Sequence, residues 1–153
     1  MFECIDYSTR KNDFDQCYII YISAPCTGIS FNFQNYFGWT KHMDYLRCLE
    51  KRYADRCQTI DIGNSVEGRS LNVMKISSPS SNGKVKPAIW IDGGIHAREW
   101  ISPSSVQYLI YELVENYDKI KNREIVDAFD VYVLPIMNPD GSVFTVISYQ
   151  FHG

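Results

Sequence analysis

The sequence predicts an α/β fold in three layers, with a mixed central sheet of parallel and antiparallel strands and helices on its faces. Two amphipathic stretches alternate with short apolar runs, in the order helix, hairpin, strand, helix, strand. The chain has 153 residues, of which 45% are hydrophobic, enough to bury one sizeable core. No internal repeat or low-complexity tract interrupts this order, so we expect a single domain.

The first predicted helix begins near Thr40, whose hydroxyl suits an N-cap. Its charged residues share one face, and its apolar positions share the other, as in a helix that packs on a core. These apolar positions are Met43, Leu46, Leu49 and Tyr53. We expect the helix to end before Cys57.

Three strands or strand-like runs follow. Gln58–Ile62 and Ser70–Ser77 are joined by a segment whose glycines and Asn64 supply turn conformations, which predicts a hairpin. After a surface loop at Ser78–Gly83, the run Ala88–Ile91 is continuously apolar. Runs of this kind are buried on both faces, so we expect a central strand.

A second helix is predicted after Ser102, a candidate N-cap with Pro103 at the first helical position. Its apolar residues keep the three- and four-residue spacing of one helical face: Val106, Leu109, Ile110, Leu113 and Tyr117. A charged connection, Asp118–Asp127, then leads to a second buried strand at Val131–Leu134. We expect this strand to stop at Pro135, before a turn at Asn138–Gly141.

Charge and hydropathy exclude several classes of partner. The formal net charge is −3 with both signs interspersed, so no basic stripe for nucleic acid is present. No run of about 18 apolar residues occurs, so we expect no membrane span. The apolar stretch Tyr18–Ala24 follows Asp13 and Asp15 rather than a basic segment, and makes a poor signal peptide.

All five cysteines lie within the first 57 residues, and their spacing matches no zinc-binding cysteine motif. For the last two, Cys48 and Cys57, the spacing is equally compatible with a disulfide in a secreted chain and with two half-buried thiols.

A candidate metal site lies in the turn after the strand Ala88–Ile91. His96 and Glu99 are three residues apart, so an imidazole and a carboxylate can face one ion from a single turn of backbone. Gly93 and Gly94 allow close backbone approach at the strand's carboxyl end, where α/β sheets place ligands. The same pair also suits a plain surface contact between histidine and glutamate, and Arg98 is either a ligand contact or a solvated charge.

These residues carry a family resemblance. Asp92-Gly-Gly-Ile-His-Ala-Arg-Glu-Trp-Ile-Ser102 resembles the first zinc-binding signature of the carboxypeptidase A/B-type zinc metallocarboxypeptidases. The resemblance runs from about Phe31, through Ile60–Arg69 and Leu71–Ile76, to Leu134–Gly141, in the family's order and spacing. We therefore expect residues 31–145 to be the N-terminal part of a catalytic domain, 1–30 a leader or gene-model artefact, and 146–153 an unrelated tail.

The resemblance implies a zinc-dependent metallocarboxypeptidase, a hydrolase that removes C-terminal residues from peptides. It implies His96 and Glu99 as the first two Zn²⁺ ligands, with Arg98 contacting substrate, and it leaves Glu67–Arg69 and Asn138–Gly141 as structural turns. It also implies secretion and a complete enzyme that is monomeric, acting on peptide or protein C-termini.

The family's third zinc ligand is a histidine well over a hundred residues beyond the first pair, past Gly153. Its general-base glutamate and its carboxylate-binding residues also lie there. We therefore expect a truncated sheet and no measurable activity from residues 1–153 alone. His152 is not expected to replace the missing ligand, because a histidine in an unstructured tail has nothing to orient it. The alternative is a non-catalytic homologue that binds peptide or a protein partner.

Overall fold

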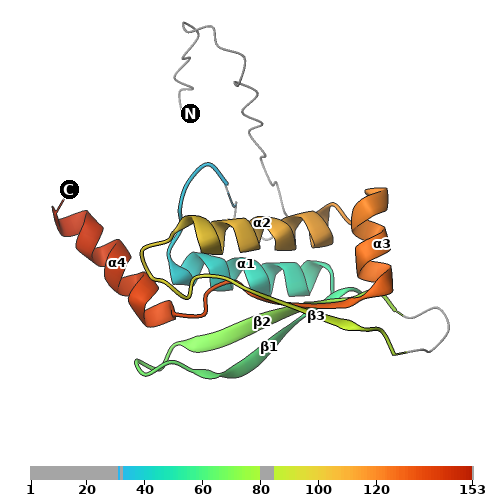
Figure 1. The fold of residues 1–153 in the computed structure, drawn as a ribbon, viewed down its shortest axis with the longest axis horizontal. Coiled ribbons are helices and arrows are strands. Elements are labelled where there is room, and N and C mark those ends of the chain that lie inside the picture. Colours follow the sequence, from blue (N-terminus) through green and yellow to red (C-terminus); the bar gives the residue numbers. More distant parts are fainter. Residues whose placement is uncertain (1–30, 32, 80–84, 153) are drawn as a thin grey trace, which may run out of the picture.

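The computed structural model describes residues 31, 33–79 and 85–152 (Figure 1). Four strands form one open sheet in the order β1-β2-β4-β3. Their bounds are β1 Cys57–Asn64, β2 Ser70–Ile76, β3 Ala88–Asp92 and β4 Asp130–Leu134. β1 pairs with β2, and β2 with β4, in antiparallel fashion, whereas β3 runs parallel to β4. The predicted α/β class with a mixed sheet is confirmed, as is the hairpin.

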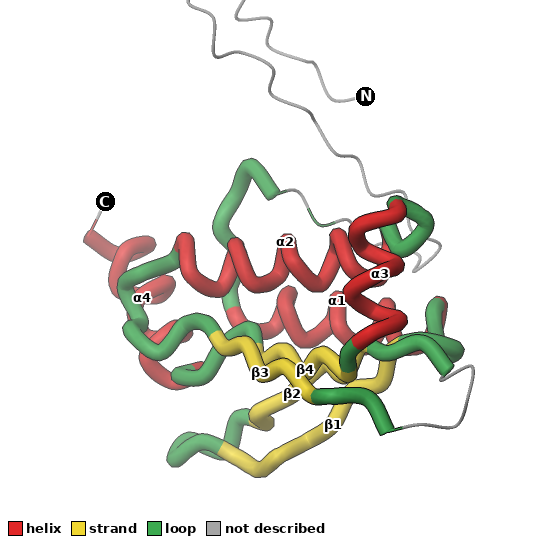
Figure 2. Tube along the Cα trace, turned by 45° about the vertical axis from the view of Figure 1, so that its right-hand side comes forward, coloured by secondary structure: helices red, strands yellow, loops and turns green. Residues whose placement is uncertain are grey.

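Four helices accompany the sheet in the described part of the chain: α1 Trp39–Arg52, α2 Ile101–Glu115, α3 Ile120–Ala128 and α4 Pro139–His152. Figures 1 and 2 show α1 and α2 side by side over one face of the sheet, with α4 extending from the end where the β1–β2 turn lies. α3 packs against α2 and β4 at the other end.

The core lies between this helical layer and the sheet. Register places Ile76 opposite Val131, and Met74 opposite Val133, so these side chains share the face that meets the helices. Buried residues of α1 and α2, including Leu46 and Ile110, pack on them. The alternate positions Lys75, Tyr132 and Trp90 lie on the opposite face, where Trp90 is 51% exposed.

The helix starts differ from the predicted ones. α1 begins at Trp39 with Gly38 as N-cap, and α2 begins at Ile101 with Trp100 as N-cap, both without a side-chain cap bond. Ser102 lies inside α2, and its hydroxyl accepts a hydrogen bond from the Gly94 N–H at 3.0 Å instead. The predicted caps were wrong, because Thr40 and Ser102 are each the second residue of their helix rather than the residue before it.

Two segments expected to be irregular are helical. The charged connection contains α3, whose one buried residue, Val126, is too weak a periodic signal to read from sequence. Residues 138–141 start α4 rather than forming an isolated turn: the Asn138 side chain accepts from the Gly141 N–H at 2.9 Å, and Pro139 is the first helical residue. α4 continues through residue 152, so the expected unstructured tail was wrong.

β3 was expected to be central, yet it is one of the two edge strands of the described sheet, because no described strand pairs with it on the side away from β4. Its side chains alternate between exposed and half-buried. The apolar residues of β3 are therefore not buried on both faces of the described sheet, although apolar runs of this kind usually are.

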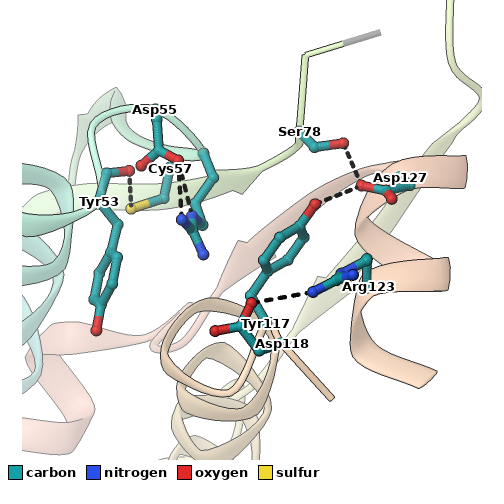
Figure 3. A network of polar contacts seen from close by, with 9 residues as sticks. Tyr53, Asp55, Cys57, Ser78, Tyr117, Asp118, Arg123 and Asp127 are labelled. Atoms are coloured by element: carbon teal, nitrogen blue, oxygen red, sulfur yellow. Dashed lines mark hydrogen bonds and ion pairs between the residues drawn. The ribbon is translucent and has the colours of Figure 1, made fainter. Parts of the chain in front are cut away.

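The end of the sheet near α3 is held by polar contacts (Figure 3). Asp127 of α3 accepts hydrogen bonds from Ser78, just after β2, and from Tyr117, just after α2, at 2.6 and 2.8 Å. These bonds tie three segments together at one corner of the molecule.

The structure does not contain a Cys48–Cys57 disulfide. Cys48 is disulfide-bonded, whereas Cys57 is a buried free thiol that donates to the Tyr53 carbonyl at 3.3 Å (Figure 3). Burial raises the pKa of the Cys57 thiol to about 12. The other cysteines, Cys4, Cys17 and Cys26, and the apolar stretch Tyr18–Ala24 lie outside the described residues. No helix in the described ranges is long and apolar enough to cross a bilayer.

Candidate metal centre

The candidate site is the turn that joins β3 to α2. At its start, a Cβ on Gly93 would lie 2.8 Å from Val106 Cγ2 and 3.2 Å from the Pro135 carbonyl oxygen. Gly94 has φ +65°, a left-handed conformation that favours glycine. The close approach predicted for the two glycines is therefore present, and it lets the chain bend away from the sheet at this point.

His96 and Glu99 lie together on the outer side of this turn. His96 Nδ1 is 3.1 Å from Glu99 Oε1, and the two side chains are 71% and 59% exposed. The turn is closed by a main-chain hydrogen bond from the Glu99 N–H to the His96 carbonyl, at 3.1 Å. The two predicted ligands are thus brought to one point, facing solvent.

The donor set fits zinc in part. Two donors on one tetrahedral zinc ion, each about 2.1 Å from it, lie about 3.4 Å apart, close to the separation found between His96 Nδ1 and Glu99 Oε1. An imidazole nitrogen and a carboxylate oxygen are also ligands that zinc accepts. The same separation suits the direct hydrogen bond that the pair makes here. Within the described ranges no third histidine, cysteine, aspartate or glutamate joins them.

Arg98, the third predicted site residue, lies in the same turn between the two candidate ligands. It is exposed, so its guanidinium is open to a ligand from solvent. An exposed guanidinium at this position can donate two parallel hydrogen bonds to a carboxylate.

The turn rests on the segment between β4 and α4. Gly93 N–H donates to the Leu134 carbonyl at 2.9 Å, and the Gly94 carbonyl accepts from the Asn138 N–H at 3.0 Å. The Asn138 side chain then reaches the Ile95 carbonyl at 3.3 Å. From the sequence, Asn138 was expected only as part of a structural turn. The Asn-Pro pair, a signature of a helix start, could have placed a helix here, but nothing local to it shows that it meets residue 95.

A second polar network connects α4 to the β1–β2 turn. Asp140 accepts from the Ser65 hydroxyl at 2.7 Å and from Arg69 Nη1 at 2.6 Å, as well as from the Glu67 N–H at 3.1 Å. Partial burial opposes ionisation of Asp140, but these hydrogen bonds and the Arg69 charge outweigh it and lower the pKa of its carboxyl. The two motifs taken from sequence as separate turns are therefore one structure, beside the candidate site.

Comparison with known proteins identifies the family. The sequence profile described as zinc carboxypeptidase matches residues 42–149, which is most of the chain. The chain belongs to the zinc carboxypeptidase family. A carboxypeptidase B from Helicoverpa zea is 40% identical over 108 residues, which are 71% of this chain and 24% of that protein. An inactive metallocarboxypeptidase, ECM14, from Paracoccidioides brasiliensis (strain Pb03) is 38% identical over 115 residues, or 74% of this chain and 20% of that protein.

Similar solved structures agree with the fold. Thrombin-activatable fibrinolysis inhibitor superimposes with a TM-score of 0.69 at 33% identity, covering 74% of this chain and 28% of that one. Carboxypeptidase A from Helicoverpa armigera gives the same TM-score of 0.69 at 28% identity, covering 76% of this chain and 28% of that one. The chain thus spans about a quarter of the length of the carboxypeptidases that it matches.

Proposed function

We propose that this chain forms part of a zinc-dependent metallocarboxypeptidase domain that hydrolyses C-terminal residues from peptides, with His96 and Glu99 as two of the zinc ligands. The observation that carries the proposal is the 3.1 Å approach of His96 Nδ1 to Glu99 Oε1 on a solvent-facing turn. Membership of the zinc carboxypeptidase family supports it.

The chain's own residues would hold the metal and meet the substrate. Zinc bound in such a site polarises a carbonyl group and lowers the pKa of a bound water molecule. His96 and Glu99 would fix the ion at the carboxyl end of β3, and Arg98 would receive a carboxylate or carbonyl oxygen of a peptide. A third ligand and a general base are also required, and in the described residues no third histidine, cysteine, aspartate or glutamate joins the pair.

We place the protein in the secretory pathway. The disulfide at Cys48 supports this, because disulfides persist in oxidising compartments and are rare in the cytosol.

A second candidate function is peptide or protein binding without hydrolysis. It is favoured by the two-residue donor set of the described site and by the similarity to a relative that is itself named inactive. In that case the exposed Arg98 and the open turn would serve recognition alone.

Zinc titration followed through the imidazole resonances of His96 tests the proposal. We expect saturable binding in the wild type, and binding at least about 10-fold weaker in Glu99→Gln, which removes one of the two anchoring donors. Asp118→Asn is the matched control, because Asp118 carries a carboxylate that is 94% exposed and lies after α2, away from the turn. Equal zinc responses in Glu99→Gln and the wild type would refute the assignment.

An assay for release of C-terminal residues separates the two candidate functions. Residues 1–153 alone are expected to give no turnover with added zinc, because no third ligand joins the pair in the described residues and the reaction also needs a general base. Turnover that disappears in Glu99→Ala would establish an active enzyme. Binding of a peptide without turnover, lost in Arg98→Ala, would favour the recognition function.

A further inference from the structure

We propose that Asn138 and Thr145 are positioning residues for His96, each holding the main-chain carbonyl of one of its sequence neighbours, Ile95 or Ala97. The inference rests on the proposed role of His96 as a metal ligand. It assigns to the start of α4 a task beyond forming a helix, namely setting the direction in which the imidazole points.

The need for such support follows from exposure. The His96 side chain is 71% exposed, and among the described residues its one polar partner is Glu99, which is itself 59% exposed. With so few neighbours, the His96 side chain is limited mainly by the position of its own backbone. Whatever fixes the main chain of residues 95–97 therefore limits the directions that the imidazole can take.

The carbonyls of Ile95 and Ala97, the residues before and after His96, are both bound by side chains from α4 and the residue before it. Ile95 O accepts from Asn138 Nδ2 at 3.3 Å, and Ala97 O accepts from the Thr145 hydroxyl at 3.0 Å. The turn also lies against α4 by direct contact, since a Cβ added to Gly141 would lie 2.8 Å from the Ala97 Cβ. The turn is thus held at two points around His96, with a close contact between them.

Thr145 contacts the turn at both ends. Its oxygen accepts from the Trp100 indole N–H at 3.2 Å while the hydroxyl faces Ala97 O, so Arg98 and Glu99 lie between its two contacts. The hydroxyl is also 3.0 Å from the Ser142 carbonyl within α4, and its single hydrogen can serve only one of the two carbonyls at a time. Removing the hydroxyl therefore releases the turn, whereas the Ser142 carbonyl stays within the helix.

The support is itself anchored. Asn138 caps α4, and Asp140, in the first turn of that helix, is bound by Ser65 and Arg69 of the β1–β2 turn. The start of α4 is consequently fixed to the sheet through side chains that do not touch His96.

Capping and positioning by Asn138 use different atoms, so they can be separated. Oδ1 accepts from the Gly141 N–H, and Nδ2 donates to the Ile95 carbonyl. Asn138→Asp keeps an acceptor for the cap and removes the donor to Ile95. Thr145→Val removes the hydroxyl while keeping nearly the same shape, whereas Thr145→Ser keeps the hydroxyl and removes only the methyl group.

The test uses the full chain with two readouts. Hydrogen exchange of the Glu99 amide, which donates to the His96 carbonyl at 3.1 Å, reports the order of the turn without metal. Zinc titration of the His96 imidazole resonances reports ligand geometry. Ser78→Ala is the control, because it removes a comparable hydroxyl bond, to Asp127 at 2.6 Å, at the far end of the sheet (Figure 3).

We expect Thr145→Val and Asn138→Asp to speed exchange of the Glu99 amide by roughly 3- to 10-fold, the factor given by loss of one hydrogen bond. Zinc binding should weaken by about 10-fold, as for other residues that orient a ligand from behind. Thr145→Ser should restore both readouts, and Ser78→Ala should change neither.

The outcomes are distinct. If both variants show the exchange rate and zinc affinity of the wild type, the proposal is overturned. Faster exchange with unchanged zinc affinity would also overturn it, because the two residues would then order the turn without affecting how His96 binds zinc. If the wild-type His96 resonances do not respond to zinc, the proposed function is wrong. The exchange rates then decide alone whether Asn138 and Thr145 position the turn.

Discussion

Replacing Gly93 with alanine adds one methyl group where β3 enters the turn of the candidate metal site. That methyl would lie 2.8 Å from Val106 Cγ2 and 3.2 Å from the carbonyl oxygens of Pro135 and Ser102. Carbon atoms in contact are normally at least about 3.5 Å apart, so Val106 would have to move by about 0.7 Å. The two oxygens belong to the main chain of β4's end and of α2, which leaves the strain little room to relax.

Overpacking of this kind costs about 1–3 kcal/mol, and we expect a loss of about 2 kcal/mol in the free energy of unfolding for Gly93→Ala. At roughly 4 °C per kcal/mol for a domain of this size, the melting temperature should fall by about 8 °C. Urea unfolding measures the loss, and an unchanged m-value confirms that the compactness of the two states is unaltered.

Val106→Ala provides the companion measurement. It creates space where the clash arises, so the loss in the double variant should be smaller than the sum of the two single losses, by about 1 kcal/mol. Additive losses, or a Gly93→Ala protein within about 0.5 kcal/mol of the wild type, would show that the close approach at this turn does not constrain residue 93.

Two further predictions concern the core between α1 and α2. Burial lowers the pKa of His42 below the ordinary histidine value of about 6.5, despite its hydrogen bond with Gln107, so the unfolded chain binds a proton more readily than the folded one. Stability should therefore fall as pH decreases through about 6.5, and it should fall less in His42→Gln. Urea unfolding between about pH 7.5 and 5.5 measures the difference. Equal pH slopes in the two proteins would contradict this. Tyr45→Phe removes the hydroxyl that donates to Glu115 Oε1 at 2.5 Å. It should cost about 1–3 kcal/mol, because Glu115 is 8% exposed and, among the described residues, keeps the longer Arg52 contact at 3.4 Å as its remaining side-chain partner. The loss should shrink in a Glu115→Gln background; an equal loss there would mean that the carboxylate charge is not the cause.

Periodic elements were predictable from sequence because their signal is local. The stripe from Met43 to Tyr53 gives α1, and the two strand patterns around Gly63–Arg69 give the hairpin. α3 was missed because only Val126 is buried in it. The run at Ala88–Ile91 reads the same whether a strand is central or at an edge, since composition does not reveal how many neighbours a strand has.

The candidate site likewise has a part that is local in sequence, and could be predicted, and a part that depends on distant segments, and could not. His96, Arg98 and Glu99 could be chosen from spacing, since three residues within one turn must lie close together. Their assignment as metal ligands and substrate contact stays a prediction. The contacts that hold the turn cross long separations, such as 43 residues from Asn138 to Ile95 and 75 from Asp140 to Ser65. The local sequence pattern of one segment does not indicate which distant segment it will contact.

The buried thiol of Cys57 can serve as an internal probe of local unfolding around β1. With a pKa of about 12, only a fraction on the order of 10⁻⁴ of this thiol is ionised at pH 8. The thiol also donates its hydrogen to the Tyr53 carbonyl. A thiol reagent should therefore modify Cys57 only in molecules that have unfolded around β1. The rate of labelling at this one peptide, followed by mass spectrometry, would give the opening free energy of the sheet's first strand without denaturant.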